Sequence, residues 1–497
     1  MNILSSLPGN PPARYLRTLT AGGALLLLSA CVSFDGISSQ AQLKTLSADS
    51  NSSAFPNQSG TWPDAGWATG IGGAQLQALI AEGWKNNPSL QAAAARISAA
   101  RAIADATGAN ALPAVNASLD STYQRFTENG MVPRPLAGSF RSNNQLALNA
   151  AYELDFWGKH SAEMRAALSQ EKVAQAESQS ARLLLSSAIA RSWLQLARQA
   201  AQLEFSQRQL ALRERLDQLT QQRVQAGLDT QSEIQQSLLQ LSSLKTEIAQ
   251  WQEAIALSRN QLATLIGAGP ERGQQIALPA FQATQSSALP AQLPLELLAR
   301  RPDIVAARWR VEASQGEVDL TKTQFYPNIN LIAFAGVSSL GVAKLLQSGS
   351  AIVGAGPAIR LPIFEGGRLR AQLKSRVAGY DVAVASYNQS INDALRDVAD
   401  QVQTLLASQA QAQQQAAAEQ AARIQLQLAQ QRQAAGTANL LTVLAAESAL
   451  LGQQRISLDI SIRRADSQIM LIKALGGGYA DHSIQDNIAQ HHTEAAQ

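Results

Sequence analysis

Between Gly158 and Gly227 the chain runs for 68 residues without a proline or an internal glycine. The run consists mostly of Ala, Gln, Leu, Arg and Ser, which are mostly fair to strong helix formers, so it predicts one uninterrupted helix. At 1.5 Å per residue such a helix is roughly 100 Å long, several times the length of an ordinary globular helix. A helix of this length favours one elongated architecture over a series of compact domains.

Three glycines recur at the same intervals in the second half of the chain. In each half the first two are 69 residues apart, and the third follows 40 residues later. The matching pairs are Gly158 and Gly367, Gly227 and Gly436, and Gly267 and Gly476. A 25-residue interval between prolines also recurs, from Pro88 to Pro113 and from Pro302 to Pro327. The chain is therefore interpreted as a tandem duplication.

Composition argues against two classes of function. Charged residues make up 15% of the chain, against about 25% in typical soluble domains. The formal net charge is only +3 and the basic residues do not cluster, so we expect no nucleic-acid partner. The four histidines have no metal-ligand spacing, and there is no phosphate-binding loop or nucleophile elbow. We expect neither an enzyme nor a bound metal or other cofactor.

The first thirty-one residues have the features of a processing segment. Arg14 and Arg17 precede the apolar run "TLTAGGALLLL", which is too short to persist as a membrane anchor. The run ends in a motif that resembles a bacterial lipobox, formed by Leu28, Ser29, Ala30 and Cys31. This resemblance implies cleavage before Cys31 and covalent lipid on its thiol, and Val32 by analogy with lipoprotein sorting indicates outer-membrane delivery. The alternative is an ordinary signal peptide with an incidental cysteine.

These landmarks divide the chain into six segments. Each repeat is expected to contain a short helix, a strand pair, a long helix ending at a glycine, and a medium helix of about forty residues. The segments are residues 1–30 as lipoprotein signal peptide, 31–75 as lipid-anchored tether, 76–270 as repeat 1, 271–290 as linker, 291–478 as repeat 2 and 479–497 as polar tail.

Two segments of each repeat change to a period of two, which predicts half-buried strands. In "QLALNAAYELDFWG" and in the segment after Pro113, apolar residues alternate with polar or small ones. The alternating set is Leu146, Leu148, Ala150, Tyr152, Leu154 and Phe156 in the first, and Val115, Ala117, Leu119, Ser121 and Tyr123 in the second. "NINLIAFAGV" and "AIVGAGPAIRLPIF" occupy the equivalent places in repeat 2. Each segment is about ten to fourteen residues long, enough for a tilted strand to cross a bilayer.

Aromatic residues gather where these strands meet the helices. They are Tyr152, Phe156, Trp157, Phe325, Tyr326 and Phe364. The cluster suits an aromatic girdle at a membrane interface, although an aromatic core between a soluble sheet and its helices would explain it as well. Residues 127–142 and 338–350, rich in Gly, Pro, Ser and Asn, are expected to form outward loops.

Four strands cannot close a transmembrane barrel, because open edges in lipid leave backbone groups unpaired. The strands must therefore be pooled between chains, and either two chains with eight strands or three with twelve would satisfy this requirement. The short and medium helices, stacked end to end, would match the length of the long helix. Six such units from three duplicated chains would wall a tube.

Apolar residues recur along the helices at coiled-coil spacing. The seams comprise Ile234, Leu241, Ile248, Ile255 and Leu262, then Leu444, Leu451 and Leu458, and Ile189, Trp193, Leu196 and Leu219 with their repeat-2 counterparts Val398, Val402, Leu405 and Leu428. The remaining Gln, Ser and Ala surface suits either a water-filled channel or a solvated coiled-coil face.

The order of motifs resembles the TolC/OprM-type outer-membrane factors, in their lipoprotein branch. The resemblance rests on "NPSLQAAAAR", "YELDFWGK", "AGLDTQSE", "RRPDIVAARWRVEAS", "FYPNINL", "LPIFEGGRLRAQL" and "AGTANLLTVLAAESAL", which span nearly the whole mature chain. It implies an α+β membrane protein, a homotrimer with a 12-stranded outer-membrane β-barrel continued by a long periplasmic α-helical barrel. The implied function is that of an exit duct for drugs or other small molecules in a tripartite efflux pump.

The resemblance also implies partners and sites. Gly227 and Gly436 would form the tips that dock a periplasmic adaptor fed by an inner-membrane pump, while the barrel contacts outer-membrane lipid. Glycine suits a helix reversal because it tolerates positive φ, although a plain helix C-cap needs the same property. Several relatives place pore-facing aspartates after the second tip, where this chain has Thr442 and Ala445. The remaining candidate gate or tip acids are Asp229, Glu233 and Glu447.

Three alternatives stay open. A metal (copper)-efflux channel or a type I secretion channel would have the same fold, although four Met and one Cys provide few soft ligands for copper. A trimeric coiled-coil adhesin would explain the long helices but not the duplicated strand pairs.

Overall fold

The computed structural model describes Phe34 and residues 36–44, 58–64, 66–281, 289–290, 297 and 299–481. The expected lipidation motif and most of the polar tail lie outside these residues. The chain divides into two units, each described by itself below. The first unit comprises Met1–Gln42, Arg101–Gln170 and Arg310–Ala385, and the second comprises Leu43–Ala100, Glu171–Trp309 and Ser386–Gln497.

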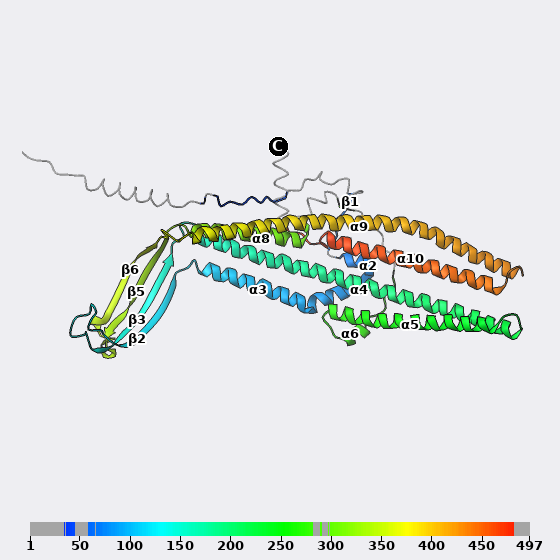
Figure 1. Cartoon of the computed structure of the whole chain (residues 1–497), viewed down its shortest axis with the longest axis horizontal. Coiled ribbons are helices and arrows are strands. Elements are labelled where there is room, and N and C mark those ends of the chain that lie inside the picture. Colours follow the sequence, from blue (N-terminus) through cyan, green and yellow to red (C-terminus); the bar gives the residue numbers. More distant parts are fainter. Residues whose placement is uncertain are drawn as a thin grey trace, which may run out of the picture. The chain divides into compact units, whose positions relative to one another are not determined.

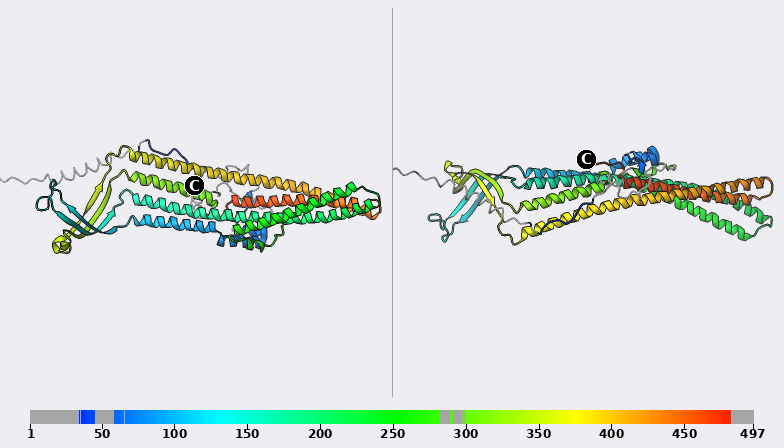
Figure 2. Two further views of the ribbon diagram at one scale, coloured as in Figure 1. Left: turned by 60° about the horizontal axis from the view of Figure 1, so that its bottom comes forward. Right: turned by 90° about the horizontal axis from the view of Figure 1, so that it is seen from above.

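The helices of the two repeats match in length. α3 (Pro88–Ala109) and α8 (Pro302–Thr323) have 22 residues each, α4 (Lys159–Gln225) and α9 (Arg368–Ala434) have 67 each, and α5 (Gln231–Leu265) and α10 (Leu440–Ala474) have 35 each. α4 with α5, and α9 with α10, form two helical hairpins (Figures 1 and 2). The duplication predicted from the glycine intervals is confirmed at the level of each helix.

The first unit contains a four-stranded antiparallel sheet (Figure 1). Its order is β2 (Ala114–Arg125), β3 (Phe140–Glu153), β5 (Asn328–Leu340) and β6 (Ala351–Arg360). The central pair β3–β5 joins the two repeats, with Ala147 opposite Gly336. A Cβ on Gly336 would lie 2.2 Å from the carbonyl oxygen of Leu146, so only glycine fits there. The four predicted strands are confirmed, although β3 and β5 extend into the expected loops and β6 ends before Phe364.

The pairing register gathers the alternating apolar residues onto one face of the sheet. On β2 this face carries Val115, Ala117, Leu119 and Tyr123. The residues paired with them on β3, and in turn on β5 and β6, continue the same face. The continuation includes Leu146, Leu148, Ala150 and Tyr152, then Leu331, Ala333, Ala335 and Val337, and Ala351, Val353, Ala355, Pro357 and Ile359. Directly opposed residues share a face, so this face is apolar across all four strands, and it becomes polar toward the loops, where Asn144 lies between Ser121 and Ser339. Many of its large side chains are exposed in the single chain, for example Val353 at 84% and Tyr123 at 74%.

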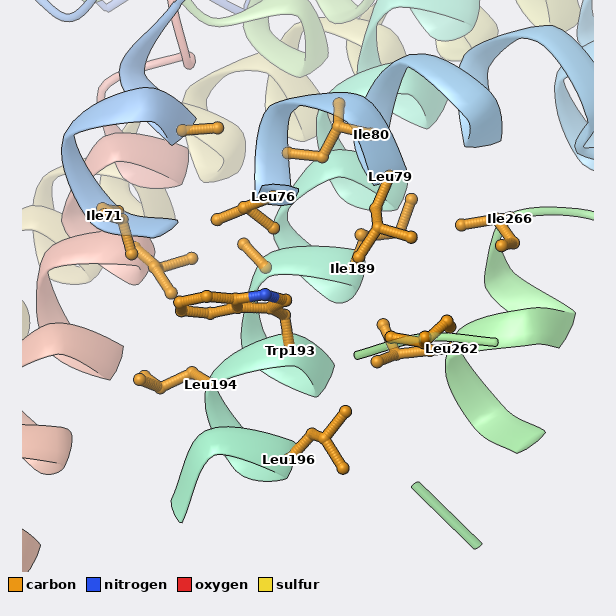
Figure 3. Close-up of a cluster of buried hydrophobic side chains, with 14 of the residues drawn as sticks. Ile71, Leu76, Leu79, Ile80, Ile189, Trp193, Leu194, Leu196, Leu262 and Ile266 are labelled. Carbon is orange, nitrogen blue, oxygen red and sulfur yellow. The ribbon is translucent and has the colours of Figure 1, made fainter. Parts of the chain in front are cut away.

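The core of the second unit lies where α2 (Trp67–Asn86) packs on α4, α5 and α10 (Figure 3). Ile189 and Leu196 of α4 are fully buried, and Trp193 is 3% exposed. On α5, Leu241, Ile255 and Leu262 are buried, as the seven-residue spacing predicts. In repeat 2, Val398, Val402 and Leu444 are buried. The seam does not extend to Leu428, which is 48% exposed.

Parts of the expected tether and linker have regular structure. α2 begins at Trp67, before the expected Leu76, and Gly73 interrupts it with φ 62° and ψ −157°. β1 (Gln58–Gly60) pairs in parallel with β4 (Leu289–Pro290), and α6 (Pro270–Gln274) follows α5. The tether and the linker are thus paired with each other, which neither sequence pattern indicated. Within the described residues, no helix combines the length and apolar character needed to span a membrane.

Candidate functional site

The turn that connects α4 to α5, residues 226–230, is called the first tip. Gly227 has φ 74°, and no atom lies within 4 Å of a Cβ built on it, so the backbone angle rather than crowding requires glycine. The amide of Leu228 donates to the carbonyl oxygen of Arg223 at 2.8 Å, which closes the end of α4. The Arg223 guanidinium donates twice to Asp229, at 2.6 and 3.2 Å. This bidentate pair holds the turn against the last residues of α4.

The pair also sets the charge of the first tip. The hydrogen bond and positive charge of Arg223 lower the pKa of Asp229 below its usual value, against a smaller opposing effect of desolvation. The same contact raises the pKa of Arg223. Asp229 is therefore ionised and already paired, which makes it a poor candidate for a free gating carboxylate.

Residues 435–439 form the second tip, which has the same backbone conformation as the first tip but different side chains. Gly436 has φ 73°, and the amide of Thr437 donates to the carbonyl oxygen of Arg432 at 2.9 Å, as in the first tip. Asn439 caps α10 by accepting from the amide of Thr442 at 3.1 Å. Ala438 stands where the first tip has Asp229. Arg432 consequently has no side-chain partner among the described residues, and it is the only charged residue between 424 and 446.

The other two candidate acids lie on helices rather than in the turn that holds Asp229. Glu233 is exposed in the first turn of α5, where a negative charge complements the helix dipole. Glu447 is half-buried on α10, in the other repeat. The side chains of Glu233 and Glu447 form no hydrogen bond or ion pair in the part of the chain that the structure describes, and a gate at these acids stays a prediction.

The six girdle aromatics separate into three groups, all in the first unit. Trp157 stacks on Tyr326 with ring centroids 4.8 Å apart and donates to the carbonyl oxygen of Pro327 at 2.8 Å. Phe325 instead meets Phe34 edge to face at 5.2 Å and packs in a small core with Ile37, Val318 and Leu373. The remaining side chains, Tyr152, Phe156 and Phe364, are exposed by 37%, 64% and 89%. Phe325 thus packs in a core, and an interfacial girdle of the other five stays a prediction.

Sequence reasoning missed the residues that form two joints, in each of which one helix ends against the start of another. Asn87 donates from its side chain to the carbonyl oxygen of Leu265 at 2.8 Å, so the start of α3 meets the end of α5. A Cβ on Gly267 would lie 2.5 Å from the carbonyl oxygen of Asn86, which shows how closely the backbones approach. This end-to-end contact was expected from the helix lengths, but not the residue that makes it. We call it the first joint.

The second joint uses an arginine at the equivalent place. Arg301 donates to the carbonyl oxygen of Ala474 at 3.4 Å, and to Asp303 and Asp397 at 2.6 and 3.2 Å. Burial lowers the pKa of Arg301, but hydrogen bonds and the charges of the two aspartates outweigh it and raise the pKa. Burial likewise raises the pKa of Asp303, but Arg301 reverses this and holds the pKa below its usual value. The signal available in the sequence was the motif "RRPDI".

The chain is similar in sequence and in fold to known outer membrane proteins. The family model described as "Outer membrane efflux protein" matches residues 79–268 and 293–477. The chain is 32% identical to the multidrug resistance outer membrane protein MdtQ of Escherichia coli O157:H7, over 92% of this chain and 96% of that protein. It is 33% identical to the fusaric acid resistance protein FusA of Burkholderia cepacia, over 74% and 71% of the two chains. The outer membrane protein VceC of Vibrio cholerae, a solved structure, aligns with a TM-score of 0.76 and 37% identity, over 84% and 100%.

Proposed function

The chain belongs to the family of outer membrane efflux proteins, and from this premise we propose that its two tips receive cargo from a periplasmic adaptor and an inner-membrane pump. The chain itself is an outer-membrane exit duct for small molecules, with a periplasmic extension. Its fold class, predicted from the sequence, is that of the trimeric α+β channels in which a β-barrel is continued by a helical barrel. The family is one of channels, and we propose that conduction is passive and that the chain catalyses no reaction.

The matched geometry of the tips carries the docking proposal. Both tips end a 67-residue helix at a glycine with φ near 74°, and both close with the same backbone hydrogen bond. No atom lies within 4 Å of a Cβ built on either glycine, so side chains do not crowd the turns. An adaptor could therefore approach the backbone closely at both tips. Leu228, exposed by 67%, and Leu440, exposed by 40%, add apolar contact area beside the two turns.

The two tips differ in charge, and this bears on the adaptor. Arg223 is neutralised by Asp229, whereas Arg432 has no such partner in the described part of the chain. We expect the adaptor surface at the second tip to present a carboxylate or the carbonyl end of a helix, either of which accepts hydrogen bonds from a guanidinium.

The cargo is proposed to be drug-like organic compounds. MdtQ is named for multidrug resistance and FusA for fusaric acid resistance. Metal cargo was the alternative that the sequence left open within the same fold. Among the residues that the structure describes, no three His, Cys, Asp or Glu side chains gather as a metal site, so no observation favours metal cargo.

Site-specific photocrosslinking in cells tests the docking proposal. A photoreactive residue replaces Ala226 or Ala435, which precede the two tip glycines, and in the control it replaces the exposed Ser98 of α3. Covalent products that mass spectrometry identifies as a membrane-fusion adaptor are expected at both tips and not at Ser98. Adaptor products at Ser98 alone would place docking elsewhere on the chain.

A further inference from the structure

α4 has one side packed under α2 and an opposite side that is polar. The side chains of Trp84 and Gln75 of α2 hydrogen-bond to Ser186 and Trp193 at 2.9 and 3.4 Å. Figure 3 shows Ile189 and Trp193 lying against the α2 residues. Successive residues are about 100° apart around a helix, so Arg191, Gln195 and Arg198 point away from α2. The covered and polar sides lie at the same level along α4.

A groove of about 670 Å³ occupies this polar side, between α4, α5 and α10. Its apolar part comes from Ala188, Leu194, Leu265 and Ile462, and its charges come from three arginines and two aspartates. Arg191 pairs with Asp466 at 2.7 Å, and Arg198 pairs with Asp459 at 2.9 Å. These two cations are therefore neutralised.

Arg463 is the third arginine, and it carries the excess charge. It lies on α10 between Asp459 and Asp466, is exposed, and forms no side-chain hydrogen bond or ion pair among the described residues. The aspartates on either side of it accept hydrogen bonds from Arg191 and Arg198 of α4 instead. The groove therefore combines an apolar floor with one guanidinium that is free to bind a ligand.

We propose that this groove lines the duct and transiently binds amphipathic organic anions, with Arg463 holding the carboxylate or sulfonate and the apolar floor holding the hydrocarbon. The inference rests on the proposed function, because a duct needs one side of its helical wall to face water. α2 covers the other side of α4 at this level, so the arginine side is the one that faces the passage. Three chains would place three such cations around the passage. A conducting site must release what it binds, and a partly exposed groove with one free cation binds weakly enough for this.

Current block in planar bilayers tests the inference. The purified full-length protein is reconstituted, naphthalene-2-sulfonate is added, and the concentration that halves the current is measured. Arg463→Gln is expected to raise this concentration about tenfold, since one charge-assisted hydrogen bond is lost. Arg464→Gln, on the neighbouring residue that does not line the groove, is expected to leave it unchanged. Arg463→Glu is expected to shift the reversal potential in a salt gradient toward cation selectivity.

Other outcomes would overturn the inference. Equal block and equal reversal potential in the parent and both Arg463 variants would show that the groove does not face the passage. Trimer dissociation in Arg463→Gln would instead assign this face to contact between protomers. In either case normal export by the parent leaves the proposed function standing, whereas a parent that neither conducts nor exports contradicts both.

Discussion

Arg301 donates a hydrogen bond to the carbonyl oxygen of Ala474, at the place in repeat 2 where Asn87 donates to Leu265 in repeat 1. Both donors occupy the position before the proline that begins the next helix. Each therefore satisfies a carbonyl at the end of one helix while starting another, so the two stacked helices act as one wall segment. The duplicated chain has kept the joint while exchanging a neutral amide for a buried guanidinium held by two aspartates.

Replacing the second joint's donor should destabilise the protein more than replacing the first. Arg301→Met leaves Asp303 and the Ala474 carbonyl without their donor, and should lower stability by roughly 1–2 kcal/mol, because both aspartates are partly exposed. Asn87→Ala loses two neutral hydrogen bonds, one donated to the Leu265 carbonyl and one accepted from the Ser89 amide, about 1 kcal/mol in total. Thermal unfolding of the purified protein measures both. A smaller loss for Arg301→Met than for Asn87→Ala would show that the ion pairs contribute little.

The second joint should also respond to acid. The pKa of Asp303 is lower in the folded chain than its usual value, so its contribution is fully present above the unfolded pKa, near 3.9. It is lost as pH falls through the lower folded pKa. Between pH 5 and 2 the melting temperature of the parent should therefore fall more steeply than that of Arg301→Met. Parallel curves would contradict a charged Arg301–Asp303 pair.

Two strand glycines offer a matched test of the sheet. Gly336→Ala would place a Cβ 2.2 Å from the Leu146 carbonyl oxygen, whereas nothing lies within 4 Å of a Cβ on Gly356. Gly336→Ala should break the β3–β5 pairing and abolish the trimer, while Gly356→Ala should assemble normally. Native mass spectrometry in mild detergent reads the stoichiometry of each. Threefold species at parental abundance in Gly336→Ala would show that assembly does not need the central strand pair.

Lipidation of Cys31 remains a prediction from the lipobox. The mature chain should begin at Cys31 and carry covalent lipid, so Cys31→Ser should leave a precursor that is neither cleaved at this site nor acylated. Mass spectrometry of the mature N-terminus checks this. An unmodified Cys31, or cleavage elsewhere, would favour an ordinary signal peptide.

Local patterns were enough to predict the long helices and the four strands of the antiparallel sheet, because each depends on residues close in sequence. The glycine intervals predicted α4 and α9, and the period of two predicted β2, β3, β5 and β6. Stacking of the short and medium helices followed from their lengths. The tips followed from Gly227 and Gly436, whose positive φ values are confirmed.

Contacts between distant segments could not be predicted in this way. Arg301 meets Asp397 and Ala474 across 96 and 173 positions of the chain, and no periodicity relates them. The pairing of Asp229 with Arg223 depends on the conformation of the turn, so a candidate gating acid proved to be already occupied. The lack of a side-chain partner for Arg432 among the described residues followed only from comparing its surroundings with those of Arg223 in the first tip. Phe325 was assigned to the girdle because composition does not distinguish an interfacial aromatic from one packed on Phe34.

The central claim, that the tips pass cargo into an outer-membrane duct, is tested most directly by export in Gly436→Val cells. Valine at φ 73° strains the turn by about 1–2 kcal/mol, while the sheet is unaltered. Gly452→Val is the control, since Gly452 lies within α10 with open space around it and no positive φ. Efflux of a fluorescent substrate is measured at equal trimer abundance in the outer membrane. We predict that Gly436→Val loses efflux and Gly452→Val keeps it; parental efflux by Gly436→Val would contradict the account.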